Sequence, residues 1–161
     1  MQATKIVKSE ERAVVDLSRP QIEPLTEGEE QSYFGMKGNL PPGINVPLHS
    51  HGDPESFYVL PGEAQVLALT EVGFEWKTVR RGDFVHIPPG TKHAWRNRSM
   101  DVFEVVMTVA PKLGRFLLEF GEIAKSESGA QLVQKLHDLD ERYGYWSGSP
   151  EENAAVGIEL I

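Results

Sequence analysis

Two short runs hold four of the five histidines of this sequence: GINVPLHSHGDPE at residues 43–55 and GDFVHIPPGTKH at residues 82–93. His49 and His51 lie two residues apart, and on a β-strand that spacing points both imidazoles to the same face. Glu55 shares their parity, and the second run supplies a further imidazole. Three imidazoles and one carboxylate suit a divalent transition metal. The two runs therefore predict one metal site, with the ligands His49, His51, Glu55 and His93.

The rest of the first 110 residues alternates short apolar runs with glycine and proline. The runs predicted as strands are Gln31–Met36, Ser56–Leu60, Ala64–Leu69, Phe74–Val79, Phe84–Ile87, Lys92–Arg96 and Val102–Val109. Short strands with regular turn signals are typical of an antiparallel sandwich or barrel. In the last run every second residue from 103 to 109 is apolar, as expected of a face buried inside a barrel. We therefore predict a mainly β fold over residues 12–110.

After Pro111 the apolar period becomes helical. Two helical stretches carry Leu113, Phe116, Leu117, Phe120 and Ile123, and then Leu132, Val133, Leu136, Leu139 and Tyr143. Pro111 suits a first helical position and Gly144 suits a C-terminal cap. The prediction is a helical hairpin over residues 111–144, packed on the barrel in a single domain of residues 1–161. The tail, residues 145–161, is expected to be loosely ordered, with its last apolar residues able to dock on a neighbour.

Composition narrows the possible partners. The chain of 161 residues has a formal net charge of −8, which argues against nucleic acid or an anionic membrane and fits a small-molecule ligand. It contains no cysteine, so a metal would be held by nitrogen and oxygen ligands alone. The N-terminus lacks the apolar segment of a signal peptide, and no run is long enough to span a bilayer. We expect a cytoplasmic protein.

The two histidine runs match both signature motifs of the cupins, and the chain resembles that family. The motifs are met by Gly43, His49, His51, Glu55 and Gly62, and by Gly82, Pro88, Gly90, His93 and Asn97. The resemblance implies a double-stranded β-helix, or jelly-roll, barrel over about residues 12–110, with the metal on the four ligands. The chain looks like a small single-domain cupin of the type-2 conserved-barrel kind. Its C-terminal helical extension is loosely similar to the small bacterial quercetinase-like proteins.

Three polar residues near the ligands have a separate interpretation. Asp53 could compete with Glu55 as the carboxylate, but its place between a glycine and a proline is typical of a turn. Asn97 is expected to hydrogen-bond behind the ligands or within a turn rather than to bind metal. His86 occupies no ligand position, could face the other side of the barrel wall, and has an open role.

Apolar residues of matching parity could line a pocket above the metal, or could simply form the barrel core. These residues are Phe34, Met36, Phe57, Val59, Trp95, Phe103 and Met107. Trp95 has the strongest case because it shares the parity of His93. An apolar, aromatic-lined cavity beside a metal favours a hydrophobic or aromatic substrate.

The leading hypothesis is a metal-dependent dioxygenase, or a related oxidoreductase, acting on a small and enolisable or aromatic molecule. The metal is one divalent ion of iron, manganese, nickel, cobalt, copper or zinc, since the ligand list does not select among them. Glu55 could also act as a general base if an apolar pocket raises its pKa. The alternatives are a non-catalytic ligand-binding protein with an anchoring metal, and a metal-assisted isomerase or decarboxylase.

The resemblance also implies a homodimer, because cupin barrels often pair through sheet faces or exchanged N-terminal strands. The first 11 residues and the run Arg12–Leu17 could supply such a strand. The alternative is a monomer whose N-terminus closes its own sheet.

Overall fold

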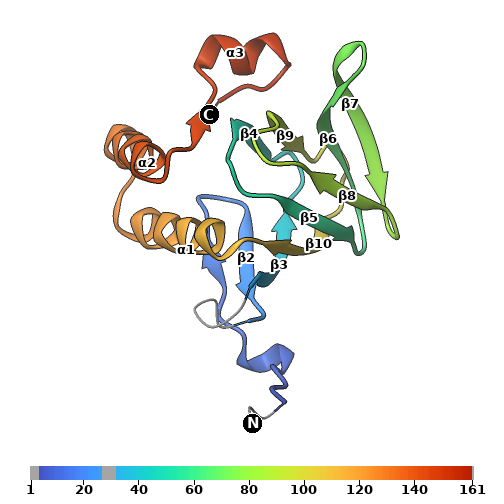
Figure 1. The fold of residues 1–161 in the computed structure, drawn as a ribbon, viewed down its shortest axis with the longest axis vertical. Coiled ribbons are helices and arrows are strands. Elements are labelled where there is room, and N and C mark those ends of the chain that lie inside the picture. Colours follow the sequence, from blue (N-terminus) through green and yellow to red (C-terminus); the bar gives the residue numbers. More distant parts are fainter. Residues whose placement is uncertain (1–3, 27–31, 161) are drawn as a thin grey trace.

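The computed structural model describes residues 4–26 and 32–160 and folds them into two antiparallel sheets with helices beside them (Figure 1). The first sheet contains, in order, β1 (Val15–Asp16), β2 (Gln21–Pro24), β3 (Phe34–Leu40), β10 (Phe103–Val109), β5 (Glu55–Val59) and β8 (Phe84–Ile87). The second contains β11 (Trp146–Ser147), β4 (Asn45–Ser50), β9 (His93–Arg96), β6 (Glu63–Thr70) and β7 (Gly73–Arg80). The predicted mainly β barrel is confirmed.

The core of the barrel lies between the two sheets. Strand β10 sits between β3 and β5, and its residues 103, 105, 107 and 109 are buried while the alternate ones are less so. Phe57 of the first sheet contacts Trp95 of the second, with ring centroids 4.9 Å apart. The alternation of apolar residues that predicted a buried face is therefore the pattern that packs one sheet onto the other.

Both predicted helices are present. Helix α1 spans Pro111–Ser126 with proline at its first position, and α2 spans Gly129–Tyr143. Gly144 ends α2 in the left-handed conformation, at φ 69°, as the glycine signal predicted. Helix α1 approaches the barrel closely, because a Cβ on its buried Gly114 would lie 2.6 Å from Cγ of Phe34. No helix in the described parts of the chain is long and apolar enough to cross a membrane.

The tail after α2 differs from the prediction. Residues 145–160 are not loosely ordered: β11 pairs with β4, and a short helix α3 (Pro150–Ala155) follows. The physical reason lies in two buried residues. The side-chain oxygen of Asn153 accepts a hydrogen bond from Leu48 N at 2.8 Å, and Ile158 packs on Leu48 in a second apolar cluster. Ile158, with Val156 packed against the same cluster, therefore docks on its own barrel, whereas Leu160 is exposed.

The N-terminal region pairs within the chain. A 3-10 turn (Ser9–Glu11) precedes β1, which pairs with β2, and β2 pairs with β3. The N-terminus thus extends its own sheet, and pairing with a second chain stays a prediction. The predicted strand Gln31–Met36 begins at Phe34, and its first residue lies outside the described part, as do residues 1–3 and 161.

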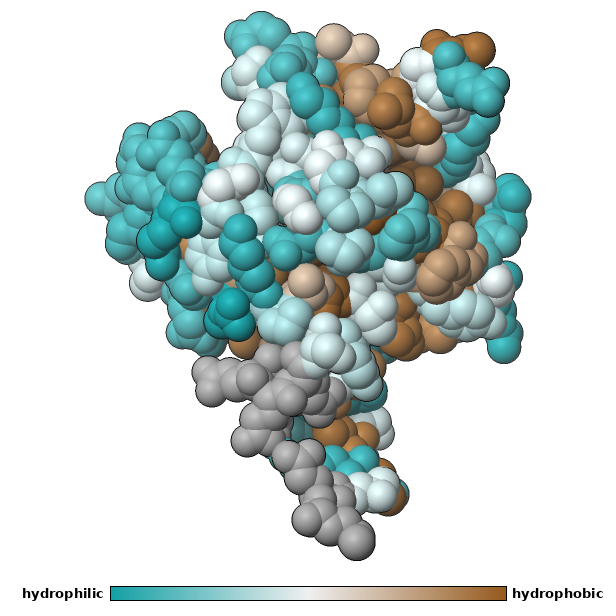
Figure 2. All heavy atoms as spheres, viewed as in Figure 1, coloured by the Kyte–Doolittle hydropathy of each residue, from teal (hydrophilic) through white to brown (hydrophobic). Residues whose placement is uncertain are grey.

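The surface differs between the two sides of the molecule. Figure 2 shows hydrophilic side chains over the helices and hydrophobic ones gathered over the strands. On the first sheet, Tyr58 of β5 and Phe84 of β8 form a cross-strand pair in which both residues are exposed.

Candidate metal centre

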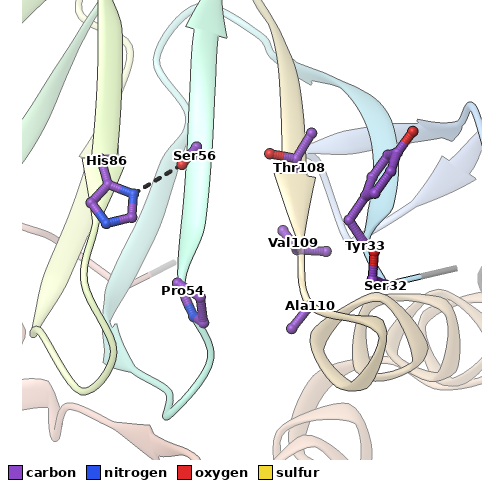
Figure 3. A pocket seen from close by; sticks show the side chains of 8 residues that line it. All are labelled: Ser32, Tyr33, Pro54, Ser56, His86, Thr108, Val109 and Ala110. Atoms are coloured by element: carbon purple, nitrogen blue, oxygen red, sulfur yellow. Dashed lines mark hydrogen bonds between the residues drawn. The ribbon is translucent and has the colours of Figure 1, made fainter.

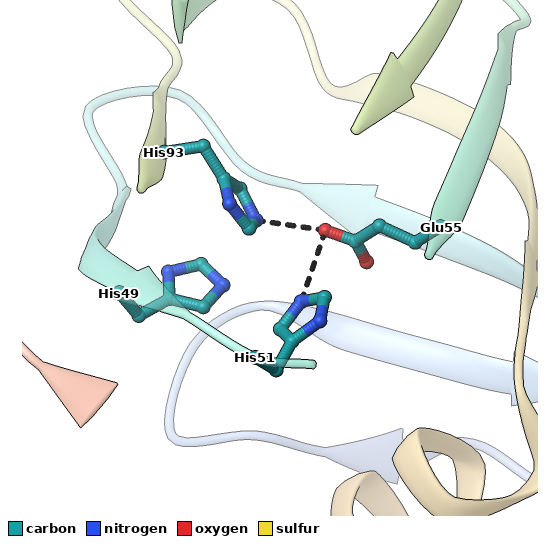
Figure 4. Close-up of side chains that lie close together, drawn as sticks. All are labelled: His49, His51, Glu55 and His93. Atoms are coloured by element: carbon teal, nitrogen blue, oxygen red, sulfur yellow. Dashed lines mark ion pairs between the residues drawn. The ribbon is translucent and has the colours of Figure 1, made fainter. Parts of the chain in front are cut away.

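Four predicted ligands converge at one end of the barrel (Figure 4). His49 lies in β4, His51 directly follows that strand, and Glu55 begins β5. His93 begins β9 and stands opposite His49 in the β4–β9 pairing. One ligand atom from each of the four lies within 4.8 Å of the others. Four residues spread over positions 49 to 93 of the sequence thus form one cluster, as the spacing predicted.

An irregularity in β4 aims its histidines. The register between β4 and β9 shifts between Val46 and His49, around Pro47. Proline has no backbone N–H to donate to a neighbouring strand, and a local bulge re-aims the side chains that follow it. The sequence signal for this irregularity was the proline two residues before His49.

The cluster is buried except at His49. His51, Glu55 and His93 are 5%, 5% and 1% exposed, while His49 keeps part of its surface open. A carboxylate and three imidazoles buried together need either a cation or a full set of hydrogen bonds. The side of His49 is therefore the more exposed side of the cluster.

The backbone selects the tautomer of all three histidines. Nδ1 of His49 lies 2.7 Å from the carbonyl oxygen of Pro47. Nδ1 of His51 and of His93 lie 2.7 and 2.9 Å from the carbonyl oxygens of Asp53 and Thr91. A carbonyl oxygen only accepts, so each Nδ1 donates and carries the proton. In the neutral rings, each Nε2 therefore keeps a lone pair for a ligand bond.

The contacts around Glu55 fit a metal ion. Its Oε1 lies 2.7 Å from Nε2 of His93 and 3.4 Å from Nε2 of His51. Both Nε2 atoms are buried without a hydrogen-bond partner. When the rings are neutral these atoms present lone pairs to a carboxylate oxygen, which is repulsive unless a cation lies between them. Nitrogen and oxygen donors arranged in this way match the preference of divalent transition metals.

Burial and charge shift the pKa values of the ligands in opposite directions. Loss of water, with a smaller contribution from the neighbouring His93, lowers the pKa of His49 from 6.5 to about 3, so His49 stays neutral. Burial alone would lower the pKa of His51, but its interaction with Glu55 outweighs burial and raises it. Burial therefore keeps His49 neutral, whereas Glu55 favours a proton on His51.

A raised pKa of Glu55, the condition set for a general-base role, is not found. Burial raises this pKa, but the interactions with His51 and His93 outweigh burial and hold it below its ordinary value. Glu55 is thus a stable anion, which suits a metal ligand and makes it a weak base. Its role as a general base stays a prediction without that support.

Asn97 is bonded within a turn. Its Nδ2 donates to the carbonyl oxygens of Leu40 and Asp101 at 2.9 and 2.7 Å, and its Oδ1 accepts from N and Oγ of Ser99. These bonds use both donors and both acceptor positions of the amide, so the side chain has none left for an imidazole. Of the two predicted roles, the structure places Asn97 in the turn rather than behind a ligand.

The structure also explains why the last residue of the first motif, Gly62, is a glycine. It adopts φ 98°, and a Cβ there would lie 2.5 Å from the carbonyl oxygen of Val102. Only glycine allows this conformation and this close approach together.

The predicted pocket residues are all buried in the main core cluster: Phe34, Met36, Phe57, Val59, Trp95, Phe103 and Met107. Phe57 follows Glu55 on the inner face of β5, and Trp95 follows His93 on β9. These two rings therefore stand next to the ligands along the barrel interior. That they contact a substrate stays a prediction.

His86 lies on the other side of the barrel wall, as predicted. Its Nδ1 is 2.9 Å from Oγ of Ser56, which alternates with the inward-facing Glu55 and Phe57 on β5. The pair borders a pocket of about 250 Å³ on the outer face of the sheet (Figure 3). His86 is not part of the metal cluster.

Sequence reasoning missed Tyr145. Its hydroxyl donates to Oδ2 of Asp53 at 2.6 Å, and its ring centroid lies 5.6 Å from that of His51. Asp53, the competing carboxylate, therefore bonds to a tyrosine and lies outside the cluster of possible ligands. A tyrosine directly after a helix-ending glycine was the available signal, but nothing in the sequence connected it to residue 53.

Comparison with known proteins agrees with the fold. Residues 36–109 match the cupin domain family. No curated protein sequence matches the chain.

Solved structures share the barrel at low sequence identity. The polyketide cyclase RemF from Streptomyces resistomycificus is 16% identical, with a TM-score of 0.60 over 68% of this chain and 80% of that one. An RmlC-like cupin from Shewanella frigidimarina is 20% identical, with a TM-score of 0.58 over 68% and 93% of the two chains. A predicted oxalate decarboxylase from Thermotoga maritima is 23% identical, with a TM-score of 0.55 over 66% and 98%. Residues 36–109, which match the cupin domain model, thus lie in a barrel of the same fold as these structures.

Proposed function

We propose that this cupin is a metal-dependent dioxygenase, or a related oxidoreductase, that acts on a small organic molecule. One observation carries the metal part of the proposal. Each of the three imidazoles bonds to a backbone carbonyl through Nδ1, which leaves its Nε2 atom free to bind an ion together with the Glu55 carboxylate. His49, His51, Glu55 and His93 would hold one divalent ion. Three neutral nitrogens and one anion leave positions open on an octahedral metal.

The side chains around the ion have distinct tasks. The backbone carbonyls hold the three rings in orientation, and Glu55 supplies the negative charge that a divalent ion favours. When bound, the metal supplies a Lewis acid and a place where an oxygen atom of the substrate and dioxygen meet. The partly open edge at His49 admits the substrate, and the barrel interior beyond the ligands limits water.

The inner wall supports an apolar or aromatic substrate. Phe57 and Trp95 pack edge to face next to the ligands and are 7% and 5% exposed. A flat, apolar molecule with one enol or hydroxyl oxygen would bind the metal through that oxygen and place its apolar part along these rings. We infer an enolisable or aromatic compound on this ground.

The reaction class needs its own test, because the barrel is shared by proteins of different activity. The similar structures are described as a polyketide cyclase and as a predicted oxalate decarboxylase, at identities that reflect the fold alone. A metal-assisted isomerase or decarboxylase and a ligand-binding protein with an anchoring metal therefore remain the competing functions.

The test begins with metal content and proceeds to oxygen. Untagged protein, purified without metal-affinity resin, is analysed by mass spectrometry beside His93→Ala and a control, His137→Ala, whose histidine is exposed on α2. We expect about one equivalent of metal in the wild type and the control, and a loss in His93→Ala. Oxygen uptake is then measured with flavonol, diketone and catechol compounds.

The outcomes separate the three functions. Oxygen consumed in proportion to substrate supports the dioxygenase. Substrate conversion without oxygen uptake would replace it with the isomerase or decarboxylase. Tight binding without conversion would replace it with the binding protein. Absence of metal from the wild type, even after reconstitution, would refute the metal centre itself.

A further inference from the structure

Tyr145 lies beside the metal centre but comes from the helical extension. Gly144 turns the chain at the end of α2, and Tyr145 N donates to the carbonyl oxygen of Asp140 at 2.9 Å. The Tyr145 ring packs against Phe116 of α1, with centroids 4.9 Å apart, and against His51 at 5.6 Å. The ring is thus held between the first helix and one predicted ligand.

Two hydrogen bonds connect Tyr145 to the Nδ1 atom of His51. The Tyr145 hydroxyl donates to Oδ2 of Asp53 at 2.6 Å. The backbone carbonyl oxygen of Asp53 accepts a hydrogen bond from His51 Nδ1 at 2.7 Å, and this bond orients the imidazole. Burial raises the pKa of Tyr145, so its hydroxyl keeps the proton that it donates.

The loop that contains Asp53 connects two of the predicted ligands. Residues 51–54 join β4 to β5 and carry His51 at one end, with Glu55 following at the other. The loop contains an exposed glycine and an exposed proline, and Gly90 N donates to the carbonyl oxygen of His51 at 2.7 Å. A shift of Asp53 would therefore move the carbonyl that orients one ligand.

The segment after Tyr145 also supports the strand that carries the histidines. Trp146 and Ser147 of β11 pair with Ser50 and His49 at the outer edge of β4. Gly148 N donates to the carbonyl oxygen of Leu48 at 2.8 Å. The same stretch of chain therefore contacts β4 next to one ligand and the 51–54 loop next to another.

We propose that Tyr145 is a positioning residue of the metal centre, which holds His51 in place through Asp53, and that the C-terminal segment completes a site whose ligands all lie within the family match of residues 36–109. This proposal rests on the metal site of the proposed function. Removing the Tyr145 hydroxyl leaves all four ligands in the chain but loosens the orientation of one of them.

The test compares two tyrosines whose hydroxyl groups donate to different carboxylates. Tyr145→Phe removes the bond to Asp53 and keeps the ring. Tyr143→Phe is the matched control, because the Tyr143 hydroxyl donates at the same 2.6 Å to Glu119 of α1, away from the 51–54 loop. Binding of Co²⁺ alone to the metal-free proteins is measured by calorimetry, and its visible d–d absorption reports the ligand geometry.

We expect Tyr145→Phe to bind Co²⁺ about tenfold more weakly, the lower end of the effect of groups behind metal ligands, with an altered d–d spectrum. Tyr143→Phe should match the wild type in both. In an Asp53→Ala background, Tyr145→Phe should have no further effect on affinity, since the link is already broken. That double variant also covers the case in which the single variant folds poorly.

Three results would overturn the proposal. Wild-type affinity and spectrum in Tyr145→Phe would show that the hydroxyl does not position His51. An equal loss in Tyr143→Phe would assign the effect to general packing of the helices. The same tenfold loss in the Asp53→Ala background would show that Tyr145 acts by another route. If wild-type protein binds no Co²⁺, the proposed function fails together with this inference.

Discussion

Metal binding should stabilise the folded barrel by an amount that can be worked out in advance. The four ligands come from β4, the loop after it, β5 and β9, so the site exists only when these elements are assembled. A ligand that binds only the folded state adds about 2.7 kcal/mol at a concentration of one hundred times its Kd. For a chain of this size, 1 kcal/mol shifts Tm by about 2–4 °C, so Co²⁺ should raise Tm by about 5–11 °C.

His93→Ala measures how much of this shift belongs to the site. Loss of one direct nitrogen should weaken binding at least as much as loss of a supporting group, about a hundredfold at the upper end. At the same Co²⁺ concentration the stabilisation then falls to about 0.4 kcal/mol, which is about 1 °C. His93 is 1% exposed, so its removal also changes the metal-free Tm. The comparison is therefore the shift caused by Co²⁺ within each variant.

Differential scanning calorimetry of metal-free protein, with and without Co²⁺, provides both numbers. The control His137→Ala retains the site and should show the full wild-type shift. A wild-type Tm that Co²⁺ leaves unchanged would refute the metal centre. An equal shift in His93→Ala would mean that Co²⁺ binds elsewhere, and the argument from the converging Nε2 atoms would be wrong.

Three further predictions test the ligand charge, the protons and the packing. Glu55→Gln should weaken Co²⁺ binding, measured by calorimetry, at least about tenfold, since the anionic ligand is lost. If the affinity were unchanged and the rate of turnover were lost, the general-base role would be favoured instead. Because the pKa of His51 is raised above 6.5, metal binding at pH 6.5 should release a proton from most molecules. Affinity should rise with pH until that raised pKa is passed, as calorimetry in buffers of different ionisation enthalpy would show. Gly114→Ala should lower the free energy of unfolding in urea by about 1–3 kcal/mol, because its Cβ would meet Phe34; a gain of about 1 kcal/mol from helix propensity would contradict the close approach.

The ligand cluster could be predicted because its information is local and periodic. His49 and His51 share a face through strand parity, and Gly62 and the Pro-Pro-Gly turn set where neighbouring strands begin. The orientation of each imidazole was not predictable, because it depends on backbone carbonyls whose directions follow from the folded loops. For the same reason the sequence left the sign of the Glu55 pKa shift open: parity placed the carboxylate in an apolar barrel but gave no distance to His93, whose contact lowers this pKa.

The C-terminal tail shows a different limit. Its short helix has a sequence signal, since Ser149 is followed by proline and, three residues on, by Glu152, and the two side chains form a reciprocal cap. Composition favoured a loose tail because residues 145–161 are rich in glycine, serine and acidic residues. What orders the segment is long-range: Asn153 bonds to Leu48, 105 residues away, and Tyr145 bonds to Asp53, 92 residues away. Contacts of that separation leave no period in the sequence, yet they join the tail to the loop and the strand that carry two of the four ligands. A function carried by the cupin motifs can therefore depend on residues that lie outside them.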